Sequence, residues 1–475
     1  MKAVRTRFAP SPTGYLHVGG IRTALFAWLI ARQSGGQFIL RFEDTDKKRE
    51  VVGARDHLMA SLHALGLEYD EGPDVGGPYA PYVQSERLES YQRWAQRLVA
   101  SGRAYADPYT ADEVDEFRAK ARAEKQPFLY RNHRPNQPPT WDGTTPLRFK
   151  SDPKAYAWHD EVMGDLSTGP EVIDDFILIK SDGYPTYNFA HIVDDAEMQI
   201  GQIIRGQEFL ASTPNYLNLY EALGITRPLL ATVPHILGPD GNKKLSKRDG
   251  AKDVLDYLRE GYLPDALINF IASLGWNDGS EQEVFSRDEL ITKFSMSHVQ
   301  RSGARFDERR LEWLNGTYIR ALQLDELYPL VSEFWPSEAA AYDDNYRKRV
   351  LELVQERLKY FAELPELTRF FFSDLPVDGA LISGHKQLKK INTTELKELL
   401  MAAKSSLEAS DFSTSDLTDR LNALLETTGQ KPAVLFSLIR IATTQAAASP
   451  GLADSLAVLG HARCMSRINL QLNAL

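Results

Sequence analysis

RFAPSPTGYLHVGG, residues 7–20, joins a strand-like beginning to a loop of prolines and glycines and then to the start of a helix. The helical pattern continues through IRTALFAWLIARQSGG, where Gly35 and Gly36 predict its end. QFILRFED, residues 37–44, reads as an apolar strand that ends on acidic residues, and VVGARDHLMASLHALG, residues 51–66, reads as a second helix. This alternation predicts an α/β fold with a doubly wound, Rossmann-like parallel sheet.

The character of the chain changes twice after this first part. Proline-rich stretches such as QPFLYRNHRPNQPPTWDG and strand-like pieces such as TPLRFK and FILIK, in place of long helices, predict an α+β insertion over residues 81–185. Strand–helix alternation returns over 186–250, so the Rossmann-like domain is expected to comprise 1–80 and 186–250. Apolar residues then recur at helical spacing, and they predict an all-α remainder: Val350, Leu353, Val354, Leu358, Phe361, Leu396, Leu399, Leu400 and Ala403.

The bulk composition describes an ordinary water-soluble protein without disulfides. The 475 residues suggest about three domains at roughly 150 residues each. The single cysteine, Cys464, excludes disulfides and a multi-cysteine zinc cluster and fits a reducing cytoplasm. The N-terminus has no apolar signal region, and no run of 18 apolar residues occurs, so no membrane partner is expected. A net charge of −10 argues against indiscriminate nucleic-acid coating but not against one structured RNA.

Two short motifs have the composition of phosphate-binding segments. In residues 8–20, glycines at a helix start allow backbone N–H groups to approach a phosphate, and His17 adds a hydrogen-bonding side chain. In GNKKLSKRDG, residues 241–250, four cations lie within six residues, so a lysine could reach a polyphosphate. Each motif alone has an ordinary alternative, which is a helix cap for the first and a solvated charged loop for the second.

Taken together, the motifs resemble the two signatures of class I aminoacyl-tRNA synthetases. HVGG at residues 17–20 resembles the HIGH signature, with Gly20 in place of its second histidine, and KLSKR at residues 244–248 resembles the KMSKS signature. Five blocks in order further resemble bacterial-type glutamyl-tRNA synthetases: RFAPSPTGYLHVGG, RFEDTD (41–46), DEGPDVGGPY (70–79), SDGYPTYNFAHIVDD (181–195) and IIRGQEFLASTPN (203–215). The resemblance covers most of residues 1–320 and implies ATP-dependent joining of glutamate to tRNA(Glu).

The resemblance implies a pocket for L-glutamate. Its residues would be Arg7, Ser11, Glu43, Tyr187 and Arg205. These residue types suit the ligand, because arginine grips a carboxylate with parallel charge-assisted bonds and a glutamate side chain can receive an ammonium. Which arginine takes the side-chain carboxylate stays open.

The resemblance also implies an ATP site and its catalytic groups. ATP would contact Pro10, Ser11, Thr13, Gly14, His17, Gly19, Gly20, Lys244, Leu245, Ser246, Lys247 and Arg248. His17 and Lys247, assisted by Lys244, would stabilise charge on the phosphates, since neither adenylate formation nor transfer needs a protein nucleophile. Mg²⁺ would arrive with the nucleotide, and tRNA would bind before the adenylate forms.

The resemblance divides the rest of the chain among tRNA contacts. The insertion at 81–185 corresponds to an acceptor-stem-binding domain, 251–322 to a stem-contact domain, and 323–475 to a helical anticodon-binding region, where Arg357 would read a base. FDERRLEWLNGTYIR (306–320) resembles the entry to that helical region. Some relatives hold zinc in the insertion, but the matching stretch AYADPYT has no cysteine. No metal is therefore expected, and His133 is expected to be a surface or structural residue.

Several alternatives stay open. The enzyme could be non-discriminating and also charge tRNA(Gln), it could be a nucleotidyltransferase with a related site, or it could be an inactive paralogue that binds tRNA. The helical carboxyl third argues against a nucleotidyltransferase. The presence of His17, Lys247 and the pocket residues argues against an inactive paralogue. A monomer in the cytoplasm is expected.

Overall fold

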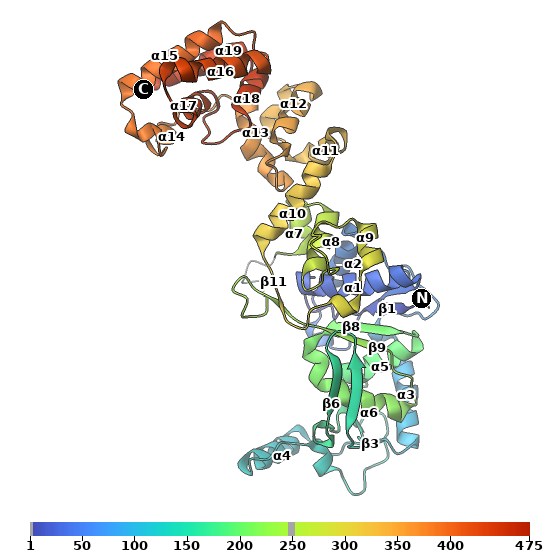
Figure 1. The fold of residues 1–475 in the computed structure, drawn as a ribbon. Helices are drawn as coiled ribbons and strands as arrows, with labels where there is room; N and C mark the ends of the chain where they lie inside the picture. The colour runs from blue at the N-terminus through green and yellow to red at the C-terminus, as the bar shows by residue number, and fades with distance from the viewer. Residues whose placement is uncertain (1–2, 246–251) are drawn as a thin grey trace. The chain divides into compact units, whose positions relative to one another are not determined.

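The structure is a computed structural model that describes residues 3–245 and 252–475. Chain contacts divide it into two compact units, residues 1–258 with 264–308 and residues 259–263 with 309–475. Each unit is described by itself (Figure 1). Within the described residues, no helix is both long enough and apolar enough to cross a lipid bilayer.

The first unit is built on a parallel sheet around one buried helix. Strand β1 (Arg5–Phe8) pairs in parallel with β2 (Gln37–Leu40), and β8 (Gln202–Gly206) pairs in parallel with β9 (Leu229–Val233). The two pairs meet where the Gly201 N–H donates to the Arg5 carbonyl at 2.9 Å. The carboxyl ends of all four strands therefore lie at one edge of the sheet, as the sequence predicted for this α/β fold.

Helix α1 (Val18–Ser34) follows β1 and packs against β1, β2 and β8. It begins at His17, whose Nδ1 accepts a hydrogen bond from the Gly19 N–H. It ends at Gly35, whose left-handed φ of 64° lets its N–H reach two helix carbonyls. The helix is apolar on nearly all sides and fully buried along Ala24–Leu29, so it anchors the core and fixes where its amino end points.

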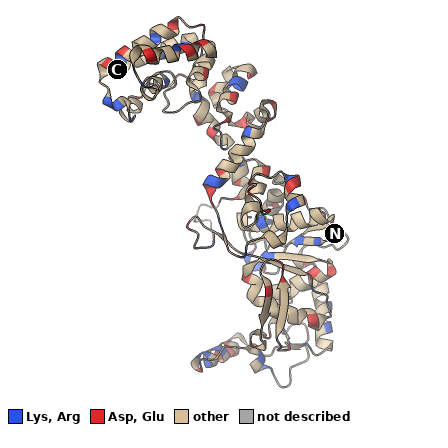
Figure 2. Cartoon of the chain, viewed as in Figure 1, with Lys and Arg blue, Asp and Glu red and all other residues tan. Residues whose placement is uncertain are grey.

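The insertion contains more helix than the sequence suggested. It begins with α3 (Leu88–Ala100) and α4 (Ala111–Ala123), so the expectation that strands replace long helices here was wrong. α4 buries none of its residues and carries charges of both signs (Figure 2), and this hides the apolar periodicity that marks a packed helix.

The remaining insertion elements form two small antiparallel sheets. One contains β3 (Ala104–Ala106), β4 (Leu147–Phe149) and β7 (Ile177–Ile179), and the other is the hairpin of β5 (Tyr156–Asp160) and β6 (Gly164–Thr168). Apolar residues of the insertion share one core with α5 (Tyr187–Glu197) and α6 (Thr213–Leu223), which frame the carboxyl edge of the main sheet.

The last part of the first unit returns to the sheet edge. After β9, the strand β10 (Ile236–Leu237) pairs in parallel with β11 (Ala304–Arg305). Helices α2 (Ala54–Ala64), α7 (Val254–Arg259), α8 (Pro264–Ser273) and α9 (Arg287–Lys293) complete the unit.

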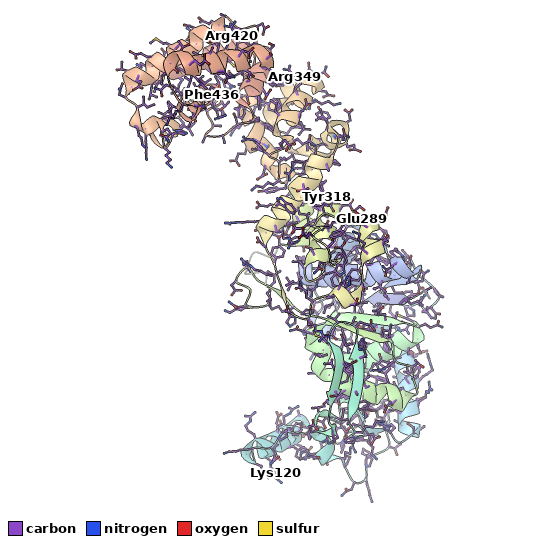
Figure 3. All side chains as sticks on the ribbon, viewed as in Figure 1. Lys120, Glu289, Tyr318, Arg349, Arg420 and Phe436 are labelled. Atoms are coloured by element: carbon purple, nitrogen blue, oxygen red, sulfur yellow. The ribbon has the colours of Figure 1, made fainter. Side chains whose placement is uncertain are left out.

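The second unit is helical, and its residues 309–475 contain no strand. After α10 (Glu308–Ala321), the helices are α11 (Leu324–Leu330), α12 (Asp344–Gln355), α13 (Leu364–Phe372), α14 (Ala380–Ser383), α15 (Thr393–Glu408), α16 (Thr414–Thr428), α17 (Pro432–Thr444), α18 (Leu452–Leu459) and α19 (His461–Ala474). Figure 3 shows Arg420 on α16 and Phe436 on α17. The all-α prediction is confirmed for residues 309–475, but the short strand β11 lies within the stretch from 251 onward that was expected to be helical, and α12 stops at Gln355. Leu358 and Phe361 lie beyond it, buried in the same cluster as Val354.

Candidate functional site

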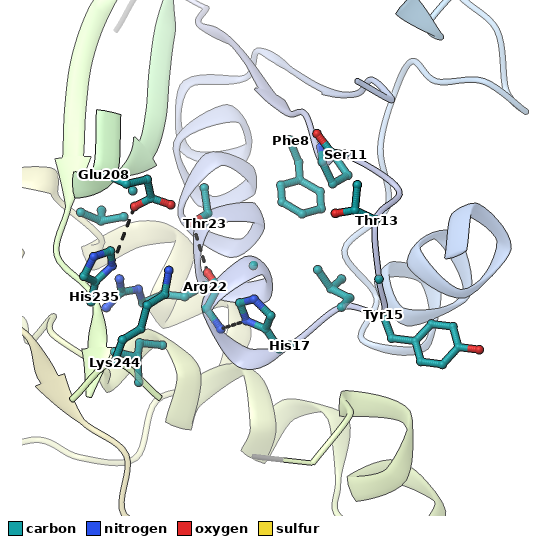
Figure 4. Close-up of a pocket in the computed structure, with 18 of the residues that line it drawn as sticks. Phe8, Ser11, Thr13, Tyr15, His17, Arg22, Thr23, Glu208, His235 and Lys244 are labelled. Carbon is teal, nitrogen blue, oxygen red and sulfur yellow. Dashed lines mark hydrogen bonds and ion pairs between the residues drawn. The ribbon is translucent and has the colours of Figure 1, made fainter. Parts of the chain in front are cut away.

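Two adjoining cavities open at the carboxyl edge of the parallel sheet. The larger one, of about 610 Å³, lies at the amino end of α1 and is called the α1 cavity (Figure 4). The smaller one, of about 230 Å³, is called the Arg205 cavity. Their common wall consists of Phe8, Ser11, Gly20, Thr23, Gly206 and Glu208. Ligands in the two cavities would therefore lie next to each other.

The α1 cavity collects most of the residues predicted to bind ATP. Those that line it are Pro10, Ser11, Thr13, Gly14, His17, Gly19, Gly20 and Lys244. Leu245 does not line it, and its N–H donates to the Ile236 carbonyl at 2.8 Å. Ser246, Lys247 and Arg248 lie outside the described residues. The predicted phosphate-binding loop and Lys244 of the cationic motif thus meet at one cavity.

His17 is exposed at the mouth of α1. Because its Nδ1 accepts from the Gly19 N–H at 3.2 Å, the neutral ring carries its proton on Nε2. That N–H is a hydrogen-bond donor beside the positive end of a helix dipole, which suits a negatively charged ligand.

Lys244 reaches the cavity from the opposite side because the chain folds back after β10. Leu237 and Lys244 form an antiparallel bridge, and the Gly238 N–H donates to the Lys243 carbonyl at 2.8 Å. Figure 4 shows Lys244 and His17 at the same pocket. Three charged or titratable residues of this cavity, Arg22, Glu208 and His235, were not predicted. Glu208 lies within the block 203–215 but was given no role, and Arg22 and His235 belong to none of the quoted motifs.

The Arg205 cavity brings together all five residues predicted to bind glutamate: Arg7, Ser11, Glu43, Tyr187 and Arg205. They come from β1, the loop after β1, the segment after β2, α5 and β8. Residues so far apart in the sequence converge because their strands end at one edge. Ser11 belongs to both cavities.

The two arginines of this cavity differ in their counter-charges. Arg7 is buried and paired with Asp195, with Nε at 3.1 Å from Oδ1 and Nη2 at 3.3 Å from Oδ2. Arg205 is also buried, but its Nη2 donates only to the Thr213 hydroxyl at 2.8 Å and its Nε has no partner. No carboxylate among the described residues lies within 4.0 Å of its nitrogens. Arg205 is thus the guanidinium whose charge is not yet matched.

Glu43 belongs to a buried ionic network that the sequence analysis did not foresee. Arg41 lies 2.9 Å from Glu43 and 2.8 Å from Asp195, and it is fully buried. Burial raises the pKa of Glu43 to about 7, although Arg41 and Arg7 oppose the shift. Although burial favours the neutral carboxyl, Arg7 and Arg41 hold the pKa of Asp195 down, at about 2. Asp195 is therefore ionised, whereas Glu43 changes charge near neutrality.

Tyr187 forms an aromatic wall of the Arg205 cavity. Its ring stacks on His191 with centroids 4.7 Å apart and on Phe209 at 5.1 Å. Burial raises the pKa of Tyr187 well above its usual value and lowers the pKa of His191 to about 3, so both rings are neutral. Neutral aromatic side chains keep the cavity wall apolar beside the charged groups.

A third cavity of about 520 Å³ shares Ser11, Glu43 and Tyr187 with the Arg205 cavity. Its remaining lining includes the cations Lys47, Lys48, Arg49 and Lys180 and the acids Asp44, Asp46, Glu50 and Asp182. The Arg205 cavity therefore adjoins a second cavity, of mixed charge, besides the α1 cavity.

No group of three His, Cys, Asp or Glu side chains within residues 3–245 and 252–475 is arranged to hold a metal ion. In the insertion, a buried ionic network links the strands instead. Arg148 lies 2.7 Å from Asp107, and the Tyr130 hydroxyl donates to Asp107 at 2.6 Å. His133 is half-buried and stacks on Phe117 at 4.3 Å. That the chain binds no zinc stays a prediction.

Arg357 lies in the second unit, exposed in the turn after α12. Burial, and next the positive charge of Arg357, lower the pKa of Arg440 on α17. Two arginines are therefore close enough to repel each other, and no ion pair of Arg357 is present among the described residues. Such a positive site favours a negatively charged partner.

Comparisons with known proteins match both parts of the chain to protein families. Residues 3–313 match the family model for tRNA synthetases class I (E and Q), catalytic domain, and residues 326–472 match that of an anticodon binding domain. A glutamate–tRNA ligase from Dehalococcoides mccartyi is 42% identical over 98% of this chain and 96% of its own length. One from Clostridium botulinum is 40% identical over 99% and 98%.

A solved structure has the same fold over its whole length. It is that of a glutamate tRNA ligase from Elizabethkingia meningosepticum in complex with its amino acid, with a TM-score of 0.86, 33% identity and coverage of 100% of both chains.

Proposed function

The chain belongs to the glutamate–tRNA ligases, which are class I aminoacyl-tRNA synthetases, and on this premise we propose how its cavities divide the reaction. L-Glutamate occupies the Arg205 cavity, ATP occupies the α1 cavity, and tRNA(Glu) receives the glutamyl group on its 3′-terminal adenosine. The observation that carries this proposal is the shared wall, because the glutamate α-carboxylate must meet the α-phosphorus of ATP.

Within the Arg205 cavity, we assign the glutamate side-chain carboxylate to Arg205. Its guanidinium has no counter-charge, whereas the two outer nitrogens of Arg7 already contact Asp195 and Ile204. Glu43 receives the α-ammonium when it is ionised, and Arg7 adds positive charge for the carboxylates. Ser11 and Tyr187 complete the walls. Glutamine would leave Arg205 without an anion in a dry cavity, and this favours glutamate.

Within the α1 cavity, the chemistry is electrostatic. The glutamate carboxylate oxygen attacks the α-phosphorus, a phosphoanhydride bond breaks, and pyrophosphate leaves with the negative charge. The His17 ring, the backbone N–H groups at the start of α1, Lys244 and, from outside the described residues, Lys247 stabilise that charge. Mg²⁺ bound to the nucleotide would neutralise part of the phosphate charge.

Transfer then joins the glutamyl group to tRNA. A ribose hydroxyl attacks the activated carbonyl, its proton is lost, and AMP leaves. We place the tRNA end in the third cavity, because this cavity shares part of its wall with the Arg205 cavity. We propose that Arg357 binds an anticodon base, that tRNA binding precedes adenylate formation, and that the ligase works as a monomer in the cytoplasm.

The pH dependence of glutamate use should report Glu43. Its pKa is raised to about 7, so the carboxylate that holds the ammonium forms only as the pH rises through 7. The KM for glutamate should therefore fall roughly tenfold between pH 6 and pH 8. Steady-state charging at saturating ATP and tRNA measures this. The Glu43→Gln variant should have a high KM for glutamate that does not depend on pH. If its KM instead varies with pH as in the unsubstituted protein, Glu43 is not the group that binds the ammonium.

Charging with radiolabelled glutamate tests the function as a whole. We expect rapid charging of tRNA(Glu). Comparable charging of tRNA(Gln) would identify a non-discriminating enzyme, charging of neither would identify a tRNA-binding paralogue, and pyrophosphate exchange without tRNA would contradict the proposed order of binding.

A further inference from the structure

Arg22 is a buried cation of the α1 cavity to which none of the roles above has been assigned. It lies on α1, is 3% exposed and lines the same cavity as His17 and Lys244 (Figure 4). Its Nη1 donates to the Leu274 carbonyl at 3.0 Å, its Nη2 donates to the Pro234 carbonyl, and its Nε has no partner. The guanidinium is thus fixed in place by neutral groups.

The charge of Arg22 is not balanced by a neighbouring carboxylate. Other buried arginines of this unit, such as Arg7 and Arg41, have carboxylates at 3.1 Å and 2.8 Å. Arg22 has none within 4.0 Å among the described residues, and Glu208 acts on it only from a distance. A buried charge without a counter-ion is costly to fold, so an anionic ligand in the cavity would relieve this cost.

The charge balance of the cavity indicates the class of anion. Its described lining contains Arg22 and Lys244 and a single acid, Glu208, beside the amino end of α1. Gly20 contributes no side chain, and a Cβ there would lie 2.6 Å from the Leu16 Cδ1, so a larger residue would need Leu16 to move. Two cations against one acid leave an excess of one positive charge, and together with the amino end of α1 this favours an anionic ligand such as a polyphosphate.

We propose that Arg22 supplies the fixed positive charge for the polyphosphate of ATP and for the departing pyrophosphate. Because two backbone carbonyls hold the guanidinium, the charge is in place before the reaction and needs no rearrangement. Arg22 thereby provides a cation for the phosphates in this cavity. The HVGG motif at residues 17–20 does not contain one, since its fourth position is Gly20. The inference rests on the proposed placement of ATP in the α1 cavity.

Matched substitutions separate the charge of Arg22 from its hydrogen bonds. Arg22→Lys keeps the charge, whereas Arg22→Gln and Arg22→Met are neutral. Arg32→Gln is a control near the carboxyl end of the same helix and outside the α1 cavity, where the half-buried Arg32 pairs with Asp70. Pyrophosphate exchange with tRNA present yields kcat and the KM values for ATP and glutamate. Thermal unfolding checks that each variant folds. If Arg22→Gln does not fold, Arg22→Met serves as the neutral variant.

We expect the neutral variants to lose roughly hundredfold in kcat/KM for ATP, with the KM for glutamate changed less than about twofold. Arg22→Lys should recover most of that loss, and Arg32→Gln should behave as the unsubstituted chain. Equal losses in the lysine and neutral variants, or equal effects on both substrates, would overturn the proposal in favour of a purely structural role.

A variant at His17 distinguishes failure of this inference from failure of the proposed ATP site. If His17→Asn impairs ATP use and neutral Arg22 variants do not, the inference about Arg22 fails alone. If neither substitution affects ATP use, the assignment of ATP to the α1 cavity fails with it.

Discussion

Arg205→Ala is expected to lower kcat/KM for glutamate by roughly 10³-fold, which corresponds to about 4 kcal/mol. The expectation follows from the buried guanidinium, which has only a hydroxyl partner and would pair with the carboxylate that distinguishes glutamate. Its removal leaves that carboxylate desolvated and unmatched. Charging kinetics at saturating ATP and tRNA measure the effect.

Two further variants serve as controls for Arg205→Ala: one keeps the positive charge at position 205, and the other removes an arginine outside the two site cavities. Arg205→Lys should recover part of the activity, because an ammonium keeps the charge but not the planar geometry. Arg227→Ala should have no effect, since Arg227 is exposed in the loop before β9 and lines neither site cavity. The KM for ATP should stay the same in all three variants. Unchanged glutamate kinetics in Arg205→Ala would show that the pocket is misassigned.

His17→Asn should slow adenylate formation by about 10²–10³-fold. Asparagine is a good amino-terminal cap, so the start of α1 should persist while the Nε2–H donor disappears. The loss should therefore appear in kcat of tRNA-dependent pyrophosphate exchange, with little change in thermal unfolding. His63→Asn on α2, away from both cavities, is the matched control. Near-normal exchange in His17→Asn would contradict the role of the ring.

The βαβ unit could be predicted from local patterns, and the family resemblance predicted that the five proposed glutamate-binding residues lie together. Gly35 ends α1 through a left-handed backbone, and the five pocket residues stand in recognisable blocks at the ends of strands. Parallel strands of one sheet bring such blocks together whatever lies between them. The same reasoning placed His17 and Lys244 at one cavity.

Other features depend on contacts that no local pattern shows. The pairing of Arg7 with Asp195 joins residues 188 positions apart, and it decides which arginine keeps an unmatched charge. Arg22 looks like an ordinary polar residue on a helix until its burial is known. α4 escaped prediction because it buries no residue, and α12 ends before Leu358 although the apolar spacing continues.

The most direct measurement is a structure of the protein with a non-hydrolysable glutamyl-adenylate analogue and tRNA(Glu). The account predicts the analogue across the shared wall, with its side-chain carboxylate on Arg205, its ammonium beside Glu43 and its phosphate at the amino end of α1 near His17. An analogue bound outside the two cavities, or bound with its side-chain carboxylate away from Arg205, would contradict it.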